Sequence, residues 1–146
     1  MSILNQKIQV VKDYIYNCVP SRKRYKVYVY GSIPNNIINN ARNSYATSIP
    51  KDQILGIIDT SSWGNGKSGI VFGTKGYCVS NCRSNYLEYP RGLDEDSFSS
   101  YYNANIVNKI SSSIYQIDKR DKEDDEFAGD IAKTVIKGVT KLIFGL

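Results

Sequence analysis

One stretch constrains the fold of this chain more than any other, residues 54–81, ILGIIDTSSWGNGKSGIVFGTKGYCVSN. Short apolar runs, rich in β-branched and aromatic residues, alternate in it with glycine, serine and asparagine. Apolar runs of this length between such residues are typical of β-strands joined by turns. We therefore predict a strand over residues 54–58, a glycine-rich connection, a second strand over 69–74, a tight turn at Lys75-Gly76 and a third strand over 77–79.

The tripeptide Gly66-Lys67-Ser68 within this stretch resembles the end of a phosphate-binding P-loop. A P-loop needs an earlier glycine, whose place Ser61 takes here, and a helix that begins at the lysine and points its N-terminus at the phosphate. The residues after Lys67 are instead a predicted strand. Because of this mismatch, we disfavour nucleotide hydrolysis and interpret the tripeptide as part of a β-hairpin connection.

Two side chains stand out around this connection. Asp59 ends the first predicted strand, where its carboxylate can accept hydrogen bonds from loop N–H groups. We interpret it as part of a structural turn in which Gly64, Gly66 and Gly69 adopt positive φ. Trp63 can serve either as a platform for a ligand or as a plug over the open end of the sheet, and we favour the plug.

The rest of the chain alternates between helical and strand patterns. Apolar residues recur at steps of three and four in the predicted helices, and they alternate with polar or aromatic residues in the strand that follows the first helix. Pro20 stops the first helix, and Pro34 begins the second. The predicted elements are an amphipathic helix over 3–18, a strand with a basic entrance over 21–31, a short helix from 34, a strand at 86–89 and a helix over 103–117.

The chain ends with a charged linker, residues 118–126, and an amphipathic helix, residues 127–146. Acids precede this helix and lysines close it, as the helix macrodipole favours. Its apolar arc can pack within the fold, drive self-association or lie on a membrane surface, and we favour packing within the fold. The same arc is a candidate partner-binding face, made of Phe127, Ile131, Val135, Val139 and Leu142.

Composition narrows the possible functions. The chain has no histidine, which removes the usual general base near neutral pH and every Ser-His or Cys-His pair. Cys78 and Cys82 make at most half a zinc site, so we interpret them as structural thiols and expect neither a metal nor a cofactor. Three cysteines without a disulfide framework, and an N-terminus without the apolar core of a signal peptide, indicate a cytoplasmic protein.

A basic cluster forms the entrance of the strand predicted over 21–31, and the whole chain has a net charge of +5. Positive charge interleaved with tyrosines suits nucleic acid, and it also suits anionic lipid headgroups. A solvated strand entrance explains the same pattern, and we favour that explanation. The candidate anion-binding residues are Arg22, Lys23, Arg24 and Lys26, interleaved with Tyr25, Tyr28 and Tyr30.

Residues 49–60 and 63–77 together resemble a group of bacterial and phage proteins with a small pleckstrin-homology-like (PH-like), or GRAM-like, core. In that group an acid, a Thr or Ser, an aromatic residue and a Gly-x-Gly-Lys-x-Gly run precede a strand, a short turn and another strand. The resemblance implies a partly open barrel or twisted sheet capped by a helix, a scaffold on which binding is commoner than catalysis. The helices at the two ends of this chain extend beyond such a core.

We therefore predict an α+β fold, with a small twisted antiparallel sheet or a partly open PH-like barrel between N-terminal and C-terminal amphipathic helices. Residues 1–117 form one domain. The expected function is non-enzymatic docking on a protein partner through the sheet edge, the hairpin tip at Trp63 and Lys67, and the last helix, for instance to inhibit a larger complex. The alternatives are nucleic-acid or anionic-lipid binding and an enzyme that uses carboxylates. The enzyme is least favoured, because its candidate acids, Asp94, Glu95 and Asp96, fit a solvated loop.

Overall fold

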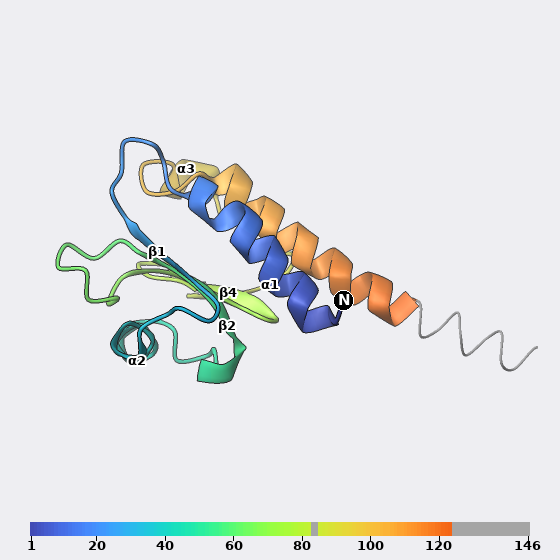
Figure 1. The fold of residues 1–146 in the computed structure, drawn as a ribbon. Coiled ribbons are helices and arrows are strands. Elements are labelled where there is room, and N and C mark those ends of the chain that lie inside the picture. Colours follow the sequence, from blue (N-terminus) through green and yellow to red (C-terminus); the bar gives the residue numbers. More distant parts are fainter. Residues whose placement is uncertain (83–84, 124–146) are drawn as a thin grey trace, which may run out of the picture.

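A computed structural model describes residues 1–82 and 85–123 of the chain (Figure 1). Its helices are α1 (Ile3–Tyr14), which continues as a 3-10 turn at Ile15–Cys18, then α2 (Asn35–Ser44), a 3-10 turn at Lys51–Gln53, and α3 (Glu95–Phe98). Its strands are β1 (Lys26–Val29), β2 (Ile54–Asp59), β3 (Gly69–Gly73), β4 (Gly76–Val79) and β5 (Tyr86–Glu88). A further helix, here named the long helix, occupies residues 104–123.

The five strands form one open antiparallel sheet in the order β1-β2-β3-β4-β5. Each strand therefore pairs with its neighbour in the sequence, and β1 and β5 are the two edges. The register of β2 shifts between Ile54 and Gly56, where the strand carries a bulge. A meander of this kind follows from the short connections, since antiparallel neighbours need only a turn between them.

Helices cover both faces of the sheet, so the molecule has three layers (Figure 1). α1 and the long helix run antiparallel, side by side, over one face, and α2 lies on the other. Alternate strand residues feed the two resulting cores: Ile70 and Phe72 join the first core, and Val71, between them, joins the second. This alternation is the usual result of the two-residue period of a strand.

Gly56 allows α1 to lie close to the sheet. A Cβ atom at this position would stand 2.8 Å from side-chain carbons of both Val11 and Ile15. Both of these residues are fully buried. The steps of three and four that predict the first helix therefore mark the face that packs on β2.

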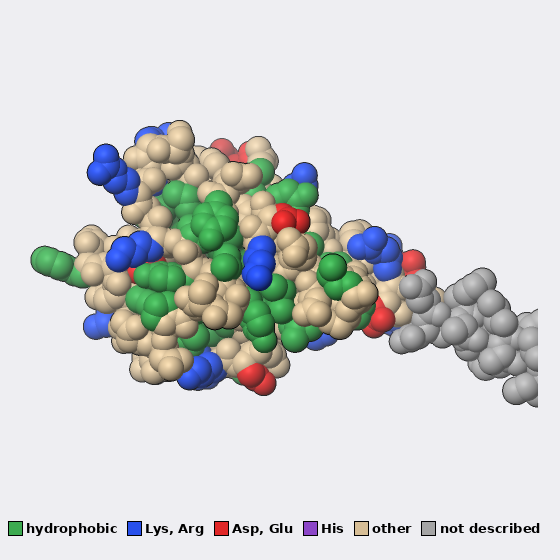
Figure 2. All heavy atoms as spheres, in the orientation of Figure 1, with side chains coloured by type: hydrophobic (Ala, Val, Ile, Leu, Met, Phe, Trp, Pro, Cys, Tyr) green, Lys and Arg blue, Asp and Glu red, His purple; other side chains and the backbone are tan. Residues whose placement is uncertain are grey.

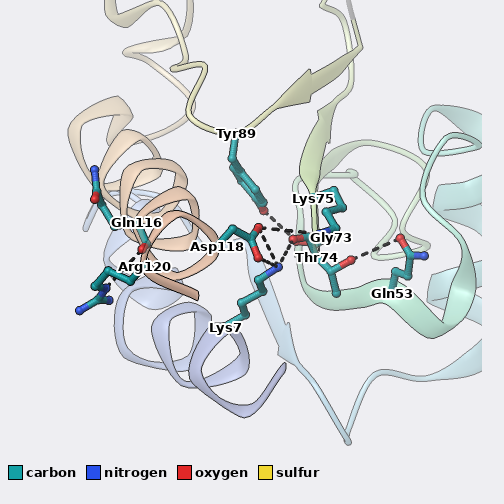
Figure 3. A network of polar contacts seen from close by, with 9 residues as sticks. All are labelled: Lys7, Gln53, Gly73, Thr74, Lys75, Tyr89, Gln116, Asp118 and Arg120. Atoms are coloured by element: carbon teal, nitrogen blue, oxygen red, sulfur yellow. Dashed lines mark hydrogen bonds and ion pairs between the residues drawn. The ribbon is translucent and has the colours of Figure 1, made fainter. Parts of the chain in front are cut away.

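A buried lysine joins the two helices of the first layer to the β3–β4 turn (Figure 3). Lys7 is 3 % exposed, and its Nζ donates to the carbonyl oxygen of Thr74 at 3.0 Å and lies 2.8 Å from Asp118 Oδ1. Nearby, the Tyr89 hydroxyl donates to the carbonyl oxygen of Gly73 at 3.0 Å. One charged side chain thus connects the start of the chain, the sheet and the long helix.

The predicted helices and strands within the described residues are found, and two of them differ in length. The strand predicted over 21–31 is confined to Lys26–Val29, and the helix predicted over 103–117 runs on to residue 123. Residues 118–123 of the predicted linker are therefore helical. The predicted helix at 127–146 lies outside the described residues. The α+β class with an open antiparallel sheet is also confirmed.

No helix of the described part is both long enough and apolar enough to cross a membrane.

Candidate docking surface at the hairpin loop

The connection between β2 and β3, residues 60–68, is here named the hairpin loop, and a buried carboxylate organises it. Asp59 is 2 % exposed at the end of β2. One of its oxygens accepts from the Ser61 N–H at 2.9 Å and from the Ser61 hydroxyl, and the other accepts from the Gly66 N–H at 3.2 Å. One side chain therefore ties together the two halves of the loop, and its predicted structural role is confirmed.

The hairpin loop is also fixed to α2. The Asn40 side-chain amide donates to the carbonyl oxygen of Asn65 at 2.8 Å. Gly66 lies so close to α2 that a Cβ atom there would stand 2.9 Å from the carbonyl oxygen of Ile37. The loop is thus fixed by Asp59 at the end of β2 and by contacts with α2.

The glycines of the loop have the predicted conformation. Gly64, Gly66 and Gly69 have φ values of 64°, 79° and 139°, a region that favours glycine. A Cβ atom on Gly69 would overlap the carbonyl oxygen of Ile58, so no other residue fits there without a shift of the backbone. β3 begins directly after Ser68 and no helix follows Lys67, which confirms the hairpin interpretation over the P-loop.

Trp63 has 89 % of its surface exposed, so the prediction that it plugs the sheet is wrong. The physical reason is that polar side chains, not apolar ones, organise the loop. The Asp59 carboxylate and the Ser61 hydroxyl bond to each other and to loop N–H groups. Trp63 is left free to contact something outside the fold, as its alternative use as a platform requires.

Two lysines flank Trp63. Lys67 is exposed within the loop itself, and Lys26, at the start of β1, is exposed beside it. The Lys26 Nζ lies 3.5 Å from the point where a Cβ atom on Gly64 would stand. The structure therefore brings one member of the predicted basic cluster next to the predicted partner-binding pair of Trp63 and Lys67.

The other members of the basic cluster lie in the connection between α1 and β1. Arg22 and Arg24 are exposed there, and Lys23 is half-buried. The neighbouring Tyr25 packs on Tyr102, with ring centroids 6.4 Å apart. The predicted alternation of charged and aromatic residues is thus real, although Tyr25 contributes to the core rather than offering a free stacking face.

A small pocket beside the hairpin loop was not foreseen from the sequence. It has a volume of about 210 Å³ and includes Tyr101, which is 49 % exposed. The adjacent tyrosines before the long helix were the one sequence signal of this pocket. Ser97 and Phe98 are close to them in the sequence, but the other lining residues come from two distant segments, at Thr60 and at Ser80 and Asn81. The pocket is lined by Thr60, Ser80, Asn81, Ser97, Phe98, Tyr101 and Tyr102.

The described residues bring together no cluster of side chains suited to metal binding. No three of their cysteines and acids converge on one point. Burial raises the pKa of Cys18 to about 12 and that of Cys78 to about 11, so both thiols stay protonated near neutral pH. Asp94 caps α3 by accepting from the Asp96 N–H at 3.0 Å, a local structural role.

The predicted partner-binding residues of the last helix lie outside the described residues. These are Phe127, Ile131, Val135, Val139 and Leu142. Comparisons of the chain with protein-family models, with curated proteins and with solved structures found no match.

Proposed function

We propose that this protein is a non-enzymatic binding module that docks on a protein partner through the hairpin loop, with Trp63 as the anchor. The observation that carries the proposal is the 89 % exposure of a tryptophan on a loop whose backbone is fixed. A buried tryptophan covers about 150–250 Å², which is worth roughly 4 to 6 kcal/mol at 25 cal/mol per Å² before the costs of association. Tryptophan is accordingly among the residues that dominate protein interfaces.

The fixed loop strengthens the proposal. Asp59 and Asn40 hold the backbone on either side of Trp63 before any partner arrives. A loop that is already ordered loses little conformational entropy on binding, so more of the burial energy appears as affinity. A mobile loop with the same tryptophan would bind more weakly.

The charges around Trp63 indicate the kind of surface it meets. Lys26 and Lys67 place positive charge on the rim of the hairpin loop. Charges on an interface rim mainly steer association and exclude partners of like charge. The expected partner surface is therefore an apolar pocket with acidic residues around it.

The resemblance of residues 49–77 to PH-like proteins is part of the same proposal. The strand–turn–strand order of β3 and β4 and the open antiparallel sheet support it. The paired helices over one face of the sheet exceed the single capping helix of that scaffold. Binding is the commoner use of such a scaffold, which agrees with the exposed position of Trp63.

The test uses the one tryptophan of the chain as its own probe. Full-length protein carrying 5-fluorotryptophan is used to capture partners from a lysate of the cells in which this protein naturally occurs. Each captured partner is then purified and titrated into the labelled protein. We expect the ¹⁹F signal of Trp63 to shift on binding, and Trp63→Ala to weaken binding at least tenfold. Tyr16→Ala, which removes an aromatic side chain that is 58 % exposed, should leave binding unchanged.

Two further titrations separate a protein partner from the alternatives. Vesicles with anionic headgroups and single-stranded RNA are added in turn to the labelled protein at several salt concentrations. A Trp63 shift with vesicles alone would assign the loop to membranes, and a steeply salt-dependent shift with RNA would assign it to nucleic acid. Either result, or equal capture by Trp63→Ala and the unaltered protein, would refute docking on a protein through Trp63.

A further inference from the structure

β1 is an edge strand, and its hydrogen-bonding direction can be read from one contact. The Tyr30 N–H donates to the carbonyl oxygen of Leu55 at 3.0 Å, so Tyr30 faces β2. In an antiparallel pair, alternate residues bond to the partner strand and those between them point away. Tyr28 therefore also faces β2, whereas Val27 and Val29 direct their N–H and C=O groups away from the sheet.

Only one of these outward-directed N–H and C=O groups is hydrogen-bonded within the described residues. The carbonyl oxygen of Val29 accepts from the N–H and the hydroxyl of Ser32, both at 3.1 Å. β1 pairs with β2 alone among the described strands. The Val27 N–H, the Val27 C=O and the Val29 N–H thus form a short, ordered row at the free edge.

The two edges of the sheet differ in this respect. β5 has three residues, and its Glu88 carbonyl oxygen accepts from the Arg91 N–H at 2.9 Å as the chain turns away. Short length and a turn of this kind are common ways to protect an edge. β1 is one residue longer and carries no proline, and its one charged residue, Lys26, stands at its start, so the stretch Val27–Val29 remains open to another strand.

Apolar surface borders β1 on both faces. Val27 and Val29 are half-buried against the first core, and Tyr28 packs against the second. Figure 2 shows hydrophobic side chains gathered on the face of the molecule that carries β1, with lysine or arginine side chains among them. On the α2 side a hollow of about 580 Å³ is lined by Tyr30, Gly31, Ile33, Ile38, Lys51, Asp52 and Ile54.

Charge is distributed unequally along β1. Its start is preceded by the exposed Arg22 and Arg24 and carries the exposed Lys26. Near its other end, the hollow contains Lys51 and Asp52, whose charges offset each other. A strand added at this edge would therefore meet net positive charge at one end only.

We propose that β1 binds an extended segment of a partner protein as a sixth strand, with apolar side chains at alternate positions and acidic residues at the end beside Arg24 and Lys26. This inference rests on the proposed function, since it names the chemistry of the partner, but it concerns the backbone edge of β1 rather than Trp63, with Lys26 common to both surfaces. Backbone hydrogen bonds provide the affinity in this mode of recognition, and side chains provide the selectivity. A second copy of this chain is the less suitable occupant, because each copy has a net charge of +5.

Synthetic peptides test the proposal without the natural partner. Three blocked nine-residue peptides of alternating valine and threonine carry three glutamates at the N-terminal end, three at the C-terminal end, or none. Binding is followed by amide NMR of the full-length protein. We expect one acidic peptide to shift the signals of residues 25–32 and to protect the Val27 and Val29 amides from solvent exchange, while the uncharged peptide binds at least tenfold more weakly.

The preferred acidic end also gives the direction of the added strand. Parallel addition places the N-terminal glutamates beside Lys26, and antiparallel addition places the C-terminal ones there. N-methylation of the peptide amides that face β1 should abolish binding, since it removes their hydrogen-bond donors. Lys26→Glu should weaken binding of the acidic peptide at least tenfold and favour a lysine-ended one, whereas Lys122→Glu, the same charge change on the long helix, should have no effect.

Four results would overturn the inference: no binding by any peptide, equal binding of the uncharged peptide, tolerance of N-methylation, or a concentration-dependent dimer that protects the Val27 and Val29 amides. These failures are distinct from failure of the proposed function. Hydrogen bonding along β1 does not involve the Trp63 side chain, so Trp63→Ala should still bind the unmethylated acidic peptide in preference to the N-methylated one. Loss of capture by Trp63→Ala together with no peptide binding would leave the proposed function in place and remove this inference alone.

Discussion

Lys7 Nζ lies 2.8 Å from Asp118 Oδ1, which joins the first helix of the chain to the long helix that ends its described part. The Lys7 side chain is 4 % exposed and that of Asp118 is 35 % exposed. The pair is therefore asymmetric, because one charge is buried and the other is partly hydrated. The antiparallel arrangement of α1 and the long helix depends on this contact as well as on their shared apolar core (Figure 3).

Asp118→Asn should destabilise the protein more than Lys7→Met. The first change leaves a buried ammonium without a counter-charge and with only neutral oxygens as acceptors, whereas the second removes the buried charge and keeps most of the volume. We expect a loss of about 1 to 3 kcal/mol for Asp118→Asn, below the cost of breaking a fully buried pair because Asp118 is partly hydrated. Urea unfolding of both single variants and the double variant measures this.

The exposed ion pair between Lys119 and Glu123, 4.0 Å apart, provides the control. Lys119→Met should change the free energy of unfolding by less than about 0.5 kcal/mol, as is usual for surface pairs. An equal loss for Lys119→Met and Asp118→Asn would contradict the importance assigned to the Lys7 contact.

Lys7 also shows what local patterns cannot reveal. The spacing of Leu4, Ile8, Val11, Ile15 and Cys18 predicts the buried face of α1, and the structure confirms it for all but Leu4, which is 40 % exposed at the start of the helix. The same pattern assigns Lys7 to the polar face, which is wrong, because its partner Asp118 is 111 positions away in the sequence. Periodicity describes one helix at a time and carries no information on which distant residue faces it.

Asp59→Ala should loosen the hairpin loop while the sheet stays folded. The change leaves the Gly66 and Ser61 N–H groups without the acceptor that they share, and unsatisfied donors of this kind cost about 1 to 3 kcal/mol. Asp59→Asn keeps one acceptor oxygen and should cost less. Hydrogen exchange of the Gly66 amide, together with urea unfolding, measures both effects.

Asp52 supplies the comparison for Asp59, because it is exposed in the 3-10 turn before β2. Asp52→Ala should leave exchange at Gly66 unchanged. If Asp59→Ala left the Gly66 amide as protected as before, the carboxylate would not be what holds the loop, and the preorganised anchor inferred for Trp63 would lose its basis.

The hairpin loop shows which part of the candidate site the sequence could predict. Its boundaries, its positive-φ glycines and the acceptor role of Asp59 depend on neighbours within ten residues, and all were predicted. The exposure of Trp63 was not predicted, since it depends on how the loop packs against the rest of the fold. Contacts of the loop with α2, such as that of Asn40 with Asn65, also come from a separate segment and leave no local signal.

Gly69→Ala and Gly31→Ala should have very different effects, although both glycines have positive φ. A Cβ atom on Gly69 would overlap the Ile58 carbonyl oxygen, whereas one on Gly31 would meet nothing within 4 Å. Gly31→Ala should therefore cost only the backbone strain of that conformation, about 1 to 2 kcal/mol. Gly69→Ala should prevent β2 and β3 from pairing and yield little folded protein, as judged by circular dichroism. Similar losses for the two variants would indicate that φ alone decides the outcome.

Tyr45→Phe should stabilise the protein, and the gain should grow with pH. The Tyr45 hydroxyl is buried and has no hydrogen-bond partner among the described residues. Removing an unsatisfied buried hydroxyl while keeping the ring should raise the free energy of unfolding by about 1 kcal/mol at pH 7.

The pH dependence of this gain follows from the burial of the ring. Burial, and then the negative charge of neighbouring groups, raises the pKa of Tyr45 well above its ordinary value of 10.0. Below pH 10 the folded and unfolded states both keep the phenolic proton, so this group gives no pH dependence. Above pH 10 the unfolded state loses the proton first, and the unaltered protein becomes less stable as pH rises.

Phenylalanine cannot ionise, so the advantage of Tyr45→Phe should widen between pH 9 and 11, up to about 1.4 kcal/mol per pH unit above 10. Urea unfolding at pH 7, 9 and 11 measures the difference, and a constant gain across this range would show that the phenol ionises as readily in the folded protein as in the unfolded chain.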